Sequence, residues 1–456
     1  MGISMKVKVI SKFDLEKIKL IKFCDGNKNF DLICRNNNLF NEIKLEEFYD
    51  IKYDGRNLSF AKITSFLEYN KIINKNIKYN EHFVLKHEHL NLLQKRFETF
   101  FNVVLTNLIE GRNIFIKHDN DCDGFSSGVQ FEIVLNSLKK KYDESNSQKI
   151  TRSLMMDPYY TIEDAFFDVS KNNRFCNPLV LVLDHGSSEQ DLLAIKYLKQ
   201  FNCIIGVIDH HCFIGENEVD KIVDCHINPY LEGGDSSLCT GVLTYELIKK
   251  MGYNKLDHVP AIPAMADKCP AEIINFYNTF GDDLEIYSKG VDYFTYLTRS
   301  NTNSIFFNDF FIKPKKYLTI FKMVLDEQNK KKLFVKEKLK SYIKEEEFNN
   351  FNFVYLNTLN IMPKKLGFGA SKIASLIRDE MTSKKSIVVC KGANGFTFRV
   401  SEEINFSINE FFEQIKLKFP NGFFMGGGHP KAGTYSFSEN FEDDILNELR
   451  KQLKSI

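Results

Sequence analysis

Short apolar runs that end in acidic or histidine residues recur along the first two thirds of the chain. Residues 113–116, 179–183 and 203–208 are such runs, and Asp or His follows each within three residues. Mostly apolar runs of this length are typical of strands buried on both faces of a parallel sheet. Helix-prone segments separate them, which predicts βαβ units and an α/β fold. Because the carboxyl ends of parallel strands meet at one edge of the sheet, we expect the polar residues to lie together there.

Three alternating acids, Asp119, Asp121 and Asp123, follow the first run and precede a predicted helix. Carboxylates this close repel one another and raise one another's pKa values unless a divalent cation binds between them. The calcium loop of the D-x-D-x-D-G type has the same alternation, but it requires a glutamate six positions after its glycine. This chain has Gln130 there, so we interpret the acids as part of a different metal site.

Further acids and a histidine pair follow the later runs. Asp184 and Asp267 each come directly after an apolar run, and Asp209, His210 and His211 end the third predicted strand. A single aspartate after a strand is often only a turn residue. Two adjacent histidines after a buried strand are more specific, because one can bind a metal while the other faces a substrate. Carboxylates together with one imidazole suit Mn²⁺, with Mg²⁺ as the alternative.

This donor set predicts a reaction at phosphorus. Two divalent ions about 3.5 to 4 Å apart form the usual arrangement for in-line displacement of a phosphodiester. In this hypothesis Asp184 bridges the two ions, His210 binds one of them, and His211 contacts the scissile phosphate or protonates the leaving oxygen. Phosphodiester hydrolysis is therefore the leading prediction for the chemistry.

The N-terminal segment has a different pattern. Residues 1–75 contain about five short strands of alternating apolar and polar residues, separated by turn-forming pairs such as Gly26-Asn27 and Asp54-Gly55. This pattern favours a small β-rich domain that resembles an oligonucleotide-binding (OB) barrel. The segment carries 14 Lys and Arg against 10 Asp and Glu, which is compatible with a surface for single-stranded nucleic acid. A purely structural role is the alternative.

Length and local pattern together predict four parts. A chain of 456 residues exceeds the usual size of one domain. Beyond residue 300 the sequence becomes charged and helix-prone, which is typical of a solvated connecting helix, and a second α/β pattern begins at residue 351. The predicted parts are a β-rich, OB-like N-terminal domain (1–80), a parallel-sheet catalytic domain (86–295), a helical connector (296–349) and a smaller α/β domain (350–456).

Composition bears on the cellular location of the protein, the state of its thiols and its partners. The chain has no long uncharged apolar run and no apolar segment of the kind found in signal peptides, which predicts a cytoplasmic protein without membrane spans. Its ten cysteines are scattered, with no C-x-x-C pair, which fits reduced thiols better than disulfides or a zinc site. The net charge is only +1. A polyanionic partner must therefore be held by a local basic surface or by metal ions.

Taken together, these motifs resemble the DHH phosphoesterase family. The C-terminal run from Gly426 to His429 resembles the signature of the family's associated domain, and Asn228-Pro229 and the segment 367–371 also fit. Within the family the chain is most similar to RecJ-like single-strand exonucleases, whose first motif reads D-x-D-x-D-G, as residues 119–124 do here. The resemblance implies a two-lobed enzyme with a metal site on the DHH lobe and an associated lobe that holds the substrate.

The resemblance also implies roles for single residues. The residues matching metal-ligand positions are Asp119, whose role varies in the family, and Asp121, Asp123, Asp184, His210 and Asp267. His211 matches the phosphate-contacting histidine and is expected to act in catalysis with Asp184. The implied substrate-binding residues are Ser371, Arg399, Ser401, Gly426, Gly427, Gly428 and His429. His185 stands where RecJ-like chains usually carry Cys, and we interpret it as a residue that supports the site.

The leading functional hypothesis is a Mn²⁺- or Mg²⁺-dependent exonuclease on single-stranded DNA or RNA, with DNA repair as one setting. One alternative is a phosphodiesterase for short oligonucleotides or cyclic dinucleotides. The N-terminal segment and the connecting helix favour a longer polymer, since two lobes suffice for a few nucleotides. The other alternative is a non-catalytic replication or assembly scaffold. The presence of every expected acid and of both histidines argues against it.

Overall fold

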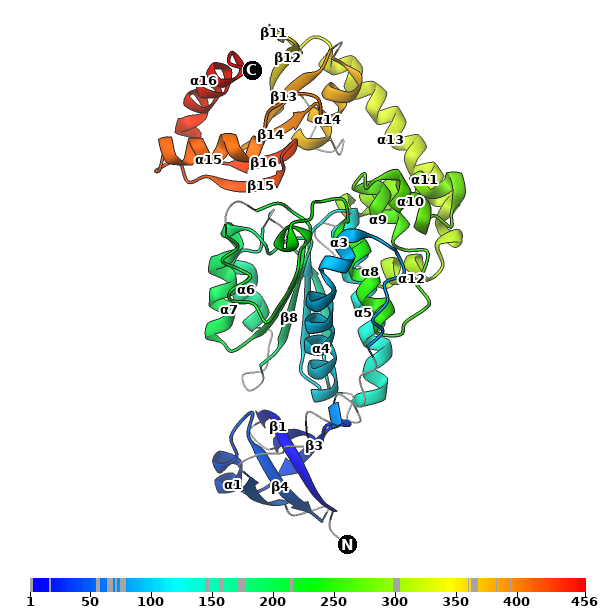
Figure 1. Cartoon of the computed structure of the whole chain (residues 1–456), viewed down its shortest axis with the longest axis vertical. Helices are drawn as coiled ribbons and strands as arrows, with labels where there is room; N and C mark the ends of the chain where they lie inside the picture. Colours follow the sequence, from blue (N-terminus) through cyan, green and yellow to red (C-terminus); the bar gives the residue numbers. More distant parts are fainter. Residues whose placement is uncertain are drawn as a thin grey trace. The chain divides into compact units, whose positions relative to one another are not determined.

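The computed structural model divides the chain into two compact units, Met1–Leu318 and Thr319–Ile456 (Figure 1). The residues that it describes are 3–15, 18–54, 58–63, 69, 72–73, 79–143, 147–155, 157, 159–170, 177–213, 216–297, 304–359, 361, 368–382, 384–393 and 395–456. Both units mix helices with a sheet, and the first holds a second sheet at its N-terminal end. The predicted α/β fold with an added β-rich segment is confirmed.

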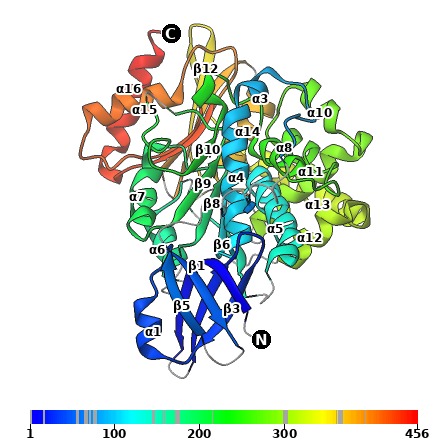
Figure 2. The same ribbon diagram turned by 60° about the horizontal axis from the view of Figure 1, so that its bottom comes forward.

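The N-terminal sheet has five antiparallel strands in the order β3-β2-β1-β4-β5 (Figure 2). The strands are β1 (Ile3–Leu15), β2 (Ile18–Cys24), β3 (Asn29–Cys34), β4 (Phe48–Tyr53) and β5 (Leu58–Ile63), and helix α1 (Asn37–Glu42) lies between β3 and β4. Strand β1 pairs with β4 up to Lys8 and with β2 from Lys8 onward, with a register shift between Val9 and Ser11. One long strand thereby joins two hairpins around a core that includes Phe23 and Tyr49.

The second sheet of the first unit is parallel throughout, with the order β10-β9-β8-β6-β7. Strands β6 (Ile114–His118), β8 (Leu179–Leu183) and β9 (Ile204–Ile208) confirm the three predicted from apolar runs. The edge strands β7 (Ile150–Leu154) and β10 (Cys225–Ile227) were not predicted. Strand β7 has three consecutive polar residues between Ile150 and Leu154, and β10 has only three residues, so neither gives a continuous apolar run.

Helices cover both faces of the parallel sheet (Figure 1). Helices α6 (Ile162–Ser170) and α7 (Leu192–Gln200) pack together over one face. Helices α4 (Gln94–Glu110), α5 (Cys122–Tyr142) and α8 (Thr240–Lys250) pack together over the other. The remaining helices of this unit are α3 (Glu88–Leu92), α9 (Ala261–Ala266), α10 (Ala271–Tyr277), α11 (Leu284–Leu297) and α12 (Ser304–Ile312).

The second unit is built on a six-stranded sheet in the order β11-β12-β13-β14-β16-β15. Its strands are β11 (Glu345–Phe348), β12 (Phe351–Asn357), β13 (Ser386–Gly392), β14 (Gly395–Val400), β15 (Met425–His429) and β16 (Ala432–Ser436). Helices α13 (Leu318–Leu339) and α14 (Ala370–Glu380) pack on one face, and α15 (Ile408–Lys418) and α16 (Glu442–Leu453) on the other. The run of glutamates in β11 was predicted to belong to the helical connector, but it pairs with β12.

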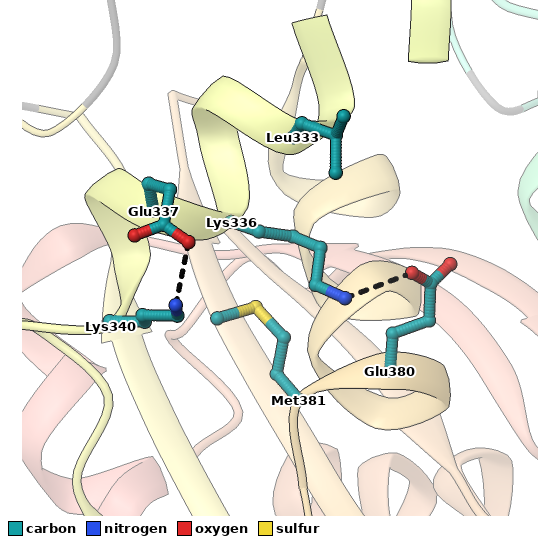
Figure 3. A pocket seen from close by; sticks show the side chains of 6 residues that line it. All are labelled: Leu333, Lys336, Glu337, Lys340, Glu380 and Met381. Atoms are coloured by element: carbon teal, nitrogen blue, oxygen red, sulfur yellow. Dashed lines mark hydrogen bonds and ion pairs between the residues drawn. The ribbon is translucent and has the colours of Figure 1, made fainter. Parts of the chain in front are cut away.

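A groove of about 350 Å³ lies between α13 and the end of α14 in the second unit (Figure 3). Two ion pairs line it: Lys336 Nζ lies 3.3 Å from Glu380 Oε2, and Lys340 Nζ lies 2.6 Å from Glu337 Oε1. Leu333 and Met381 supply its apolar surface. Among the described residues that line this groove, none was predicted as a site residue.

Two findings concern the predicted reduced thiols and the predicted lack of membrane spans. Nine cysteines in the described ranges are free thiols, as the scattered spacing predicted. No helix in those ranges combines the length and the apolar character needed to cross a membrane.

Candidate metal centre

The predicted metal ligands of the first unit converge at the carboxyl edge of the parallel sheet. Asp119, Asp121 and Asp123 follow β6, Asp184 follows β8, and His210 lies just after β9. Strand β8 lies between β6 and β9 in the sheet, so the three segments are neighbours although they are far apart in sequence. This is the arrangement expected for the ends of adjacent parallel strands.

Ligand atoms of these residues form two overlapping groups. In one group, atoms of Asp123, Asp184 and His210 all lie within 4.8 Å of one another, and in the other the same holds for Asp119, Asp121 and Asp184. Each group offers the oxygen and imidazole donors that suit Mn²⁺ or Mg²⁺. Asp184 belongs to both groups, as the prediction of a bridging carboxylate requires.

Asp184 occupies an unusual backbone conformation. Its φ is 64°, in the left-handed region that is costly for a residue with a side chain. Its N–H donates to the carbonyl oxygen of Ile208 at 2.8 Å, which ties the turn after β8 to the end of β9. Strain of this kind persists where the surrounding structure fixes it, often at functional sites.

His210 lies among three carboxylates. Its Nε2 is 3.0 Å from Asp267 Oδ2, 3.5 Å from Asp184 Oδ1 and 3.8 Å from Asp123 Oδ2. The imidazole and Asp184 are buried. Asp267 caps the carboxyl end of α9, where a carboxylate faces the partial negative charge of the helix. Helix stability therefore does not explain an acid at this position, whereas a metal site does.

The N-terminus of α8 holds the carboxylate of Asp123. The N–H of Thr240 donates to Oδ2 at 2.8 Å and the N–H of Gly241 donates to Oδ1 at 2.7 Å, while Thr240 Oγ1 donates to Asp184 Oδ1 at 3.0 Å. A Cβ at position 241 would lie 2.6 Å from Pro263 Cγ and 2.8 Å from Asp123 Oδ1. Thr240 and Gly241 were not predicted, because nothing in the local sequence indicates that this helix begins against residue 123.

The first acidic loop is also held by its own helix, α5. Asp121 is the N-cap residue, and its Oδ1 accepts from the N–H of Gly124 at 2.9 Å. A Cβ at position 124 would lie 2.6 Å from the carbonyl oxygen of Asp119. The glycine after the three acids therefore lets the loop fold back closely on its helix.

A buried hydrogen-bond network holds the backbone of this loop. His118 Nδ1 lies 2.7 Å from the carbonyl oxygen of Asp119, and its Nε2 lies 2.9 Å from Arg152 Nη1. The guanidinium of Arg152 only donates, so Nε2 accepts and Nδ1–H donates to the loop carbonyl. Glu132 accepts from Arg152 Nε at 2.9 Å. Burial, followed by the charge of Arg152, lowers the pKa of His118 to about 3, so this imidazole is neutral at physiological pH.

His211 is oriented by the acid that precedes the histidine pair. Its Nδ1 lies 2.8 Å from Asp209 Oδ1, which also accepts the N–H groups of His210 at 2.8 Å and of His211 at 3.1 Å. Asn228 Nδ2 donates to the carbonyl oxygen of His211 at 3.0 Å. Burial would raise the pKa of Asp209, but His211 and two further imidazoles hold it far below its usual range. Asp209 therefore stays ionised and fixes the ring of His211.

The charges of the centre fit a bound cation. Burial first, and then repulsion by neighbouring acids, raises the pKa values of Asp121 and Asp184 well above the usual range. Burial would lower the pKa of His210, but Asp267 and Asp123 raise it to about 10. Without a metal, these carboxyl groups bind protons more tightly than usual and the imidazole of His210 is charged. A divalent ion relieves both conditions, so the donor set fits Mn²⁺ or Mg²⁺.

In the second unit the structure brings two of the predicted substrate-binding residues together. Arg399 Nη2 donates to Ser371 Oγ at 2.6 Å, and Arg399 Nε donates to Ser375 Oγ at 3.0 Å. Ser375 was not predicted, although it lies one helical turn after Ser371 on α14. Ser401 has a different environment, because its Oγ accepts from the N–H of Ser386 at 2.9 Å. In the described part of the chain it is not a partner of Arg399.

The glycine-rich segment belongs to a pair of strands. Residues 425–429 form strand β15, paired with β16. Gly426 and Gly428 both have φ of 135°, and a Cβ at either would lie within 2.4 Å of a carbonyl oxygen of β16. Nothing lies within 4 Å of a Cβ at Gly427. Two of the glycines thus allow close pairing of the strands, while Gly427 and His429 share a strand face with open space at Gly427.

Comparison with known proteins identifies the parallel-sheet segment. The family model described as the DHH family, N-terminal domain, matches residues 113–269, which include the acidic loop, both histidines and Asp267. An uncharacterized protein of Methanocaldococcus jannaschii is 26% identical over 426 residues. That match covers 82% of this chain but 56% of the relative, so the chain spans little more than half the length of this curated relative.

Solved structures share the fold. The DHH domain of a member of the s1p family of ribosomal proteins superposes with a TM-score of 0.73 at 21% identity, covering 86% of this chain and 98% of that one. RecJ of Thermus thermophilus in complex with Mn²⁺ gives 0.57 at 12% identity, covering 79% and 55%. An exonuclease RecJ bound to manganese gives 0.53 at 12% identity, covering 79% and 94%. At the level of the fold, the predicted similarity to DHH domains and to RecJ is confirmed.

Proposed function

The chain carries a DHH-family N-terminal domain, and we propose that it is a metal-dependent phosphodiesterase that degrades single-stranded nucleic acid as a RecJ-like exonuclease. The observation that carries this proposal is the position of Asp184 in both three-residue donor groups. One carboxylate shared by two groups is what a two-ion centre for phosphoryl displacement requires. Mn²⁺ is the proposed ion, with Mg²⁺ as the alternative.

The side chains of the first unit have different proposed roles. Asp119, Asp121, Asp123, Asp184, His210 and Asp267 would hold the ions. Two such ions would supply Lewis acidity toward a phosphate and toward an attacking water. His211 Nδ1 lies 2.8 Å from Asp209 Oδ1, and we assign this oriented ring the contact with the scissile phosphate or the leaving oxygen.

Two observations support nucleic acid as the substrate class. Two solved structures with the same fold are of RecJ with manganese, and one of these proteins is named an exonuclease. In the second unit, Arg399 is fixed by Ser371 and Ser375, and a planar guanidinium held in this way suits a phosphate group. We propose that Arg399, Ser371, His429 and the backbone beside the open space at Gly427 bind a phosphate of the substrate, and that Ser401 positions the end of β14 beside them.

The test is hydrolysis by wild-type protein and by Asp184→Asn. End-labelled single-stranded DNA, RNA, a dinucleotide and a cyclic dinucleotide are incubated with Mn²⁺. We expect stepwise shortening of the long strands by wild-type protein and none by Asp184→Asn. The control, Asp282→Asn, changes an exposed acid and should retain full activity.

Each alternative has its own outcome. Hydrolysis of dinucleotides or cyclic dinucleotides alone would replace the exonuclease with a phosphodiesterase for short substrates. Binding of nucleic acid without hydrolysis of any substrate would favour the scaffold. Full activity of Asp184→Asn would remove the two-ion centre from the proposal.

A further inference from the structure

Two histidines at the metal centre each lie beside a carboxylate of their own. His211 Nδ1 is 2.8 Å from Asp209 Oδ1, and His185 Nε2 is 3.3 Å from Asp119 Oδ2. The two imidazole rings are stacked, with centroids 5.3 Å apart and planes inclined by 13°. His185 thus repeats, side by side, the arrangement that orients His211.

The backbone specifies the position of His185. It lies between Asp184, with φ of 64°, and Gly186, with φ of 101°. A Cβ at position 186 would lie 3.0 Å from Val182 Cγ1 and 3.1 Å from Val207 Cγ1. Two left-handed residues in a turn packed against β8 and β9 hold His185 at one place at the edge of the centre.

The ring of His185 is partly exposed, and one of its nitrogens forms no hydrogen bond with a described residue. Its side chain is 13% exposed, and that of His211 is 24% exposed. In the described part of the chain, no residue forms a hydrogen bond with Nδ1 of His185. Because Asp119 lies at Nε2, the other nitrogen of the ring is available to a bound molecule, as expected for a contact rather than for internal support.

We propose that His185 contacts a phosphate oxygen of the substrate beside His211 and is a second imidazole of the catalytic centre. This inference rests on the proposed phosphodiester hydrolysis and extends it. It also replaces the interpretation from sequence, in which His185 only supports the site. Stacking holds the two rings parallel, Asp209 fixes the rotation of His211, and Asp119 lies beside Nε2 of His185, so that both rings present a nitrogen to one anionic group.

The most specific test distinguishes the contribution of the aromatic ring of His185 from that of its two nitrogens. His185→Phe keeps an aromatic ring that can stack on His211 but removes both nitrogens, and His185→Gln keeps a hydrogen-bond donor. Inhibition constants for a nucleoside 5′-monophosphate and KM for single-stranded DNA are measured with Mn²⁺. We expect His185→Phe to weaken monophosphate binding and raise KM by about tenfold or more, the loss expected for a hydrogen bond to a charged group. His185→Gln should recover part of this loss.

Two further measurements rule out a merely structural effect. The melting temperature and the Mn²⁺ affinity of His185→Phe should match those of wild-type protein, and His82→Phe, at an exposed histidine, should change nothing. Wild-type KM and wild-type monophosphate binding in His185→Phe would overturn the inference. If His185→Phe does not fold, His185→Gln decides it: a KM raised less than tenfold but above wild type supports the contact, and an unchanged KM overturns it.

The outcomes also distinguish a failure of this inference from a failure of the proposed function. Absence of hydrolysis by wild-type protein would contradict the proposed function. In that case calorimetric binding of the monophosphate to Mn²⁺-loaded protein decides about His185 alone. If the monophosphate binds wild-type protein more tightly than His185→Phe, the contact is supported. If both proteins bind it equally, or if neither binds it, the inference is overturned.

Discussion

Individual residues of the metal centre hold one another in protonation states that a bound cation would change. Asp123 illustrates this, because two backbone N–H groups from α8 bind its oxygens and yet burial and Asp267 raise its pKa. Hydrogen bonds that favour the charged form thus compete with a repulsion that a bound cation would remove. The centre is therefore best understood as preorganised for a metal.

His210 gives the first prediction, which concerns pH. Its pKa is raised to about 10, because Asp267 and Asp123 outweigh the effect of burial, so the imidazole is protonated near neutral pH. Binding a metal through Nε2 requires the neutral ring, so at least one proton should leave for each ion bound there. The apparent Mn²⁺ affinity should therefore rise with pH below about 10, by up to about tenfold per unit for each proton released.

Calorimetric titration of Mn²⁺ in two buffers with different ionisation enthalpies measures the protons released. Asp184→Asn, which lacks the shared ligand, should give no saturable binding and serves as the control. Binding of Mn²⁺ with no proton release would show that His210 is not a ligand.

The residues that the sequence did and did not predict differ in how they act. Asp119, Asp123, Asp184 and His210 could be predicted, because each is a strong metal donor placed directly after a strand. Arg152 could not be predicted, because it acts on the loop through His118, which is 34 residues away in sequence. Support of this kind depends on which strands are neighbours, and local sequence does not record that.

The helices and strands contribute mainly through their ends. Helix α8 begins with two N–H groups on Asp123, and the amino end of a helix favours a carboxylate there. Mostly apolar runs revealed β6, β8 and β9, which are buried along their whole length apart from the partly buried Ile204 at the start of β9. The strand conformation of residues 425–429 could not be predicted, because a run of glycines has no apolar pattern and its pairing depends on close contact with β16.

Gly241→Ala tests the role of the α8 terminus. The added Cβ would lie 2.6 Å from Pro263 Cγ and 2.8 Å from Asp123 Oδ1, so the first turn of α8 must shift away from the carboxylate. Loss of a group that orients a ligand typically costs about 10- to 100-fold in metal affinity, and we expect a loss of this size for Mn²⁺. Electron paramagnetic resonance of free Mn²⁺ measures it.

The matched control is Gly369→Ala, where an added Cβ meets nothing within 4 Å, and its Mn²⁺ affinity should equal that of wild-type protein. An unchanged affinity in Gly241→Ala would mean that the N-terminus of α8 does not position Asp123 for the metal.

For the chain as a whole, the N-terminal sheet and the metal centre contact opposite ends of the same strand. Glu110 and Arg112 precede β6, and the acidic loop follows it. Lys8 Nζ lies 2.8 Å from Glu110 Oε1, and Glu46 Oε1 lies 2.7 Å from Arg112 Nη2. The sequence predicted the five strands, but not where they attach, because these ion pairs join residues 66 and 102 positions apart.

This attachment gives the last prediction, for Glu110→Ala. Arg112 Nε lies 2.6 Å from Glu110 Oε2, and both side chains are buried. Removing one partner of a buried ion pair costs about 3 to 5 kcal/mol, and we expect the lower end because Glu46 still pairs with Lys8 and Arg112. Lys62→Ala, in an exposed pair with Glu47, should cost far less, because water screens exposed ion pairs. Chemical denaturation of the full chain measures both.

The pH dependence and the metal affinity decide how this result is interpreted. Burial would raise the pKa of Glu110, but Arg112 and Lys8 lower it below its usual value. The stability that Glu110 contributes is therefore present above the pKa of the unfolded chain and is lost as the pH falls through the folded value. The difference between wild type and Glu110→Ala should accordingly shrink in acid. Because the ion pairs lie before β6 and the centre after it, Mn²⁺ affinity should not change, and a parallel loss of affinity would show that the N-terminal sheet is coupled to the metal centre.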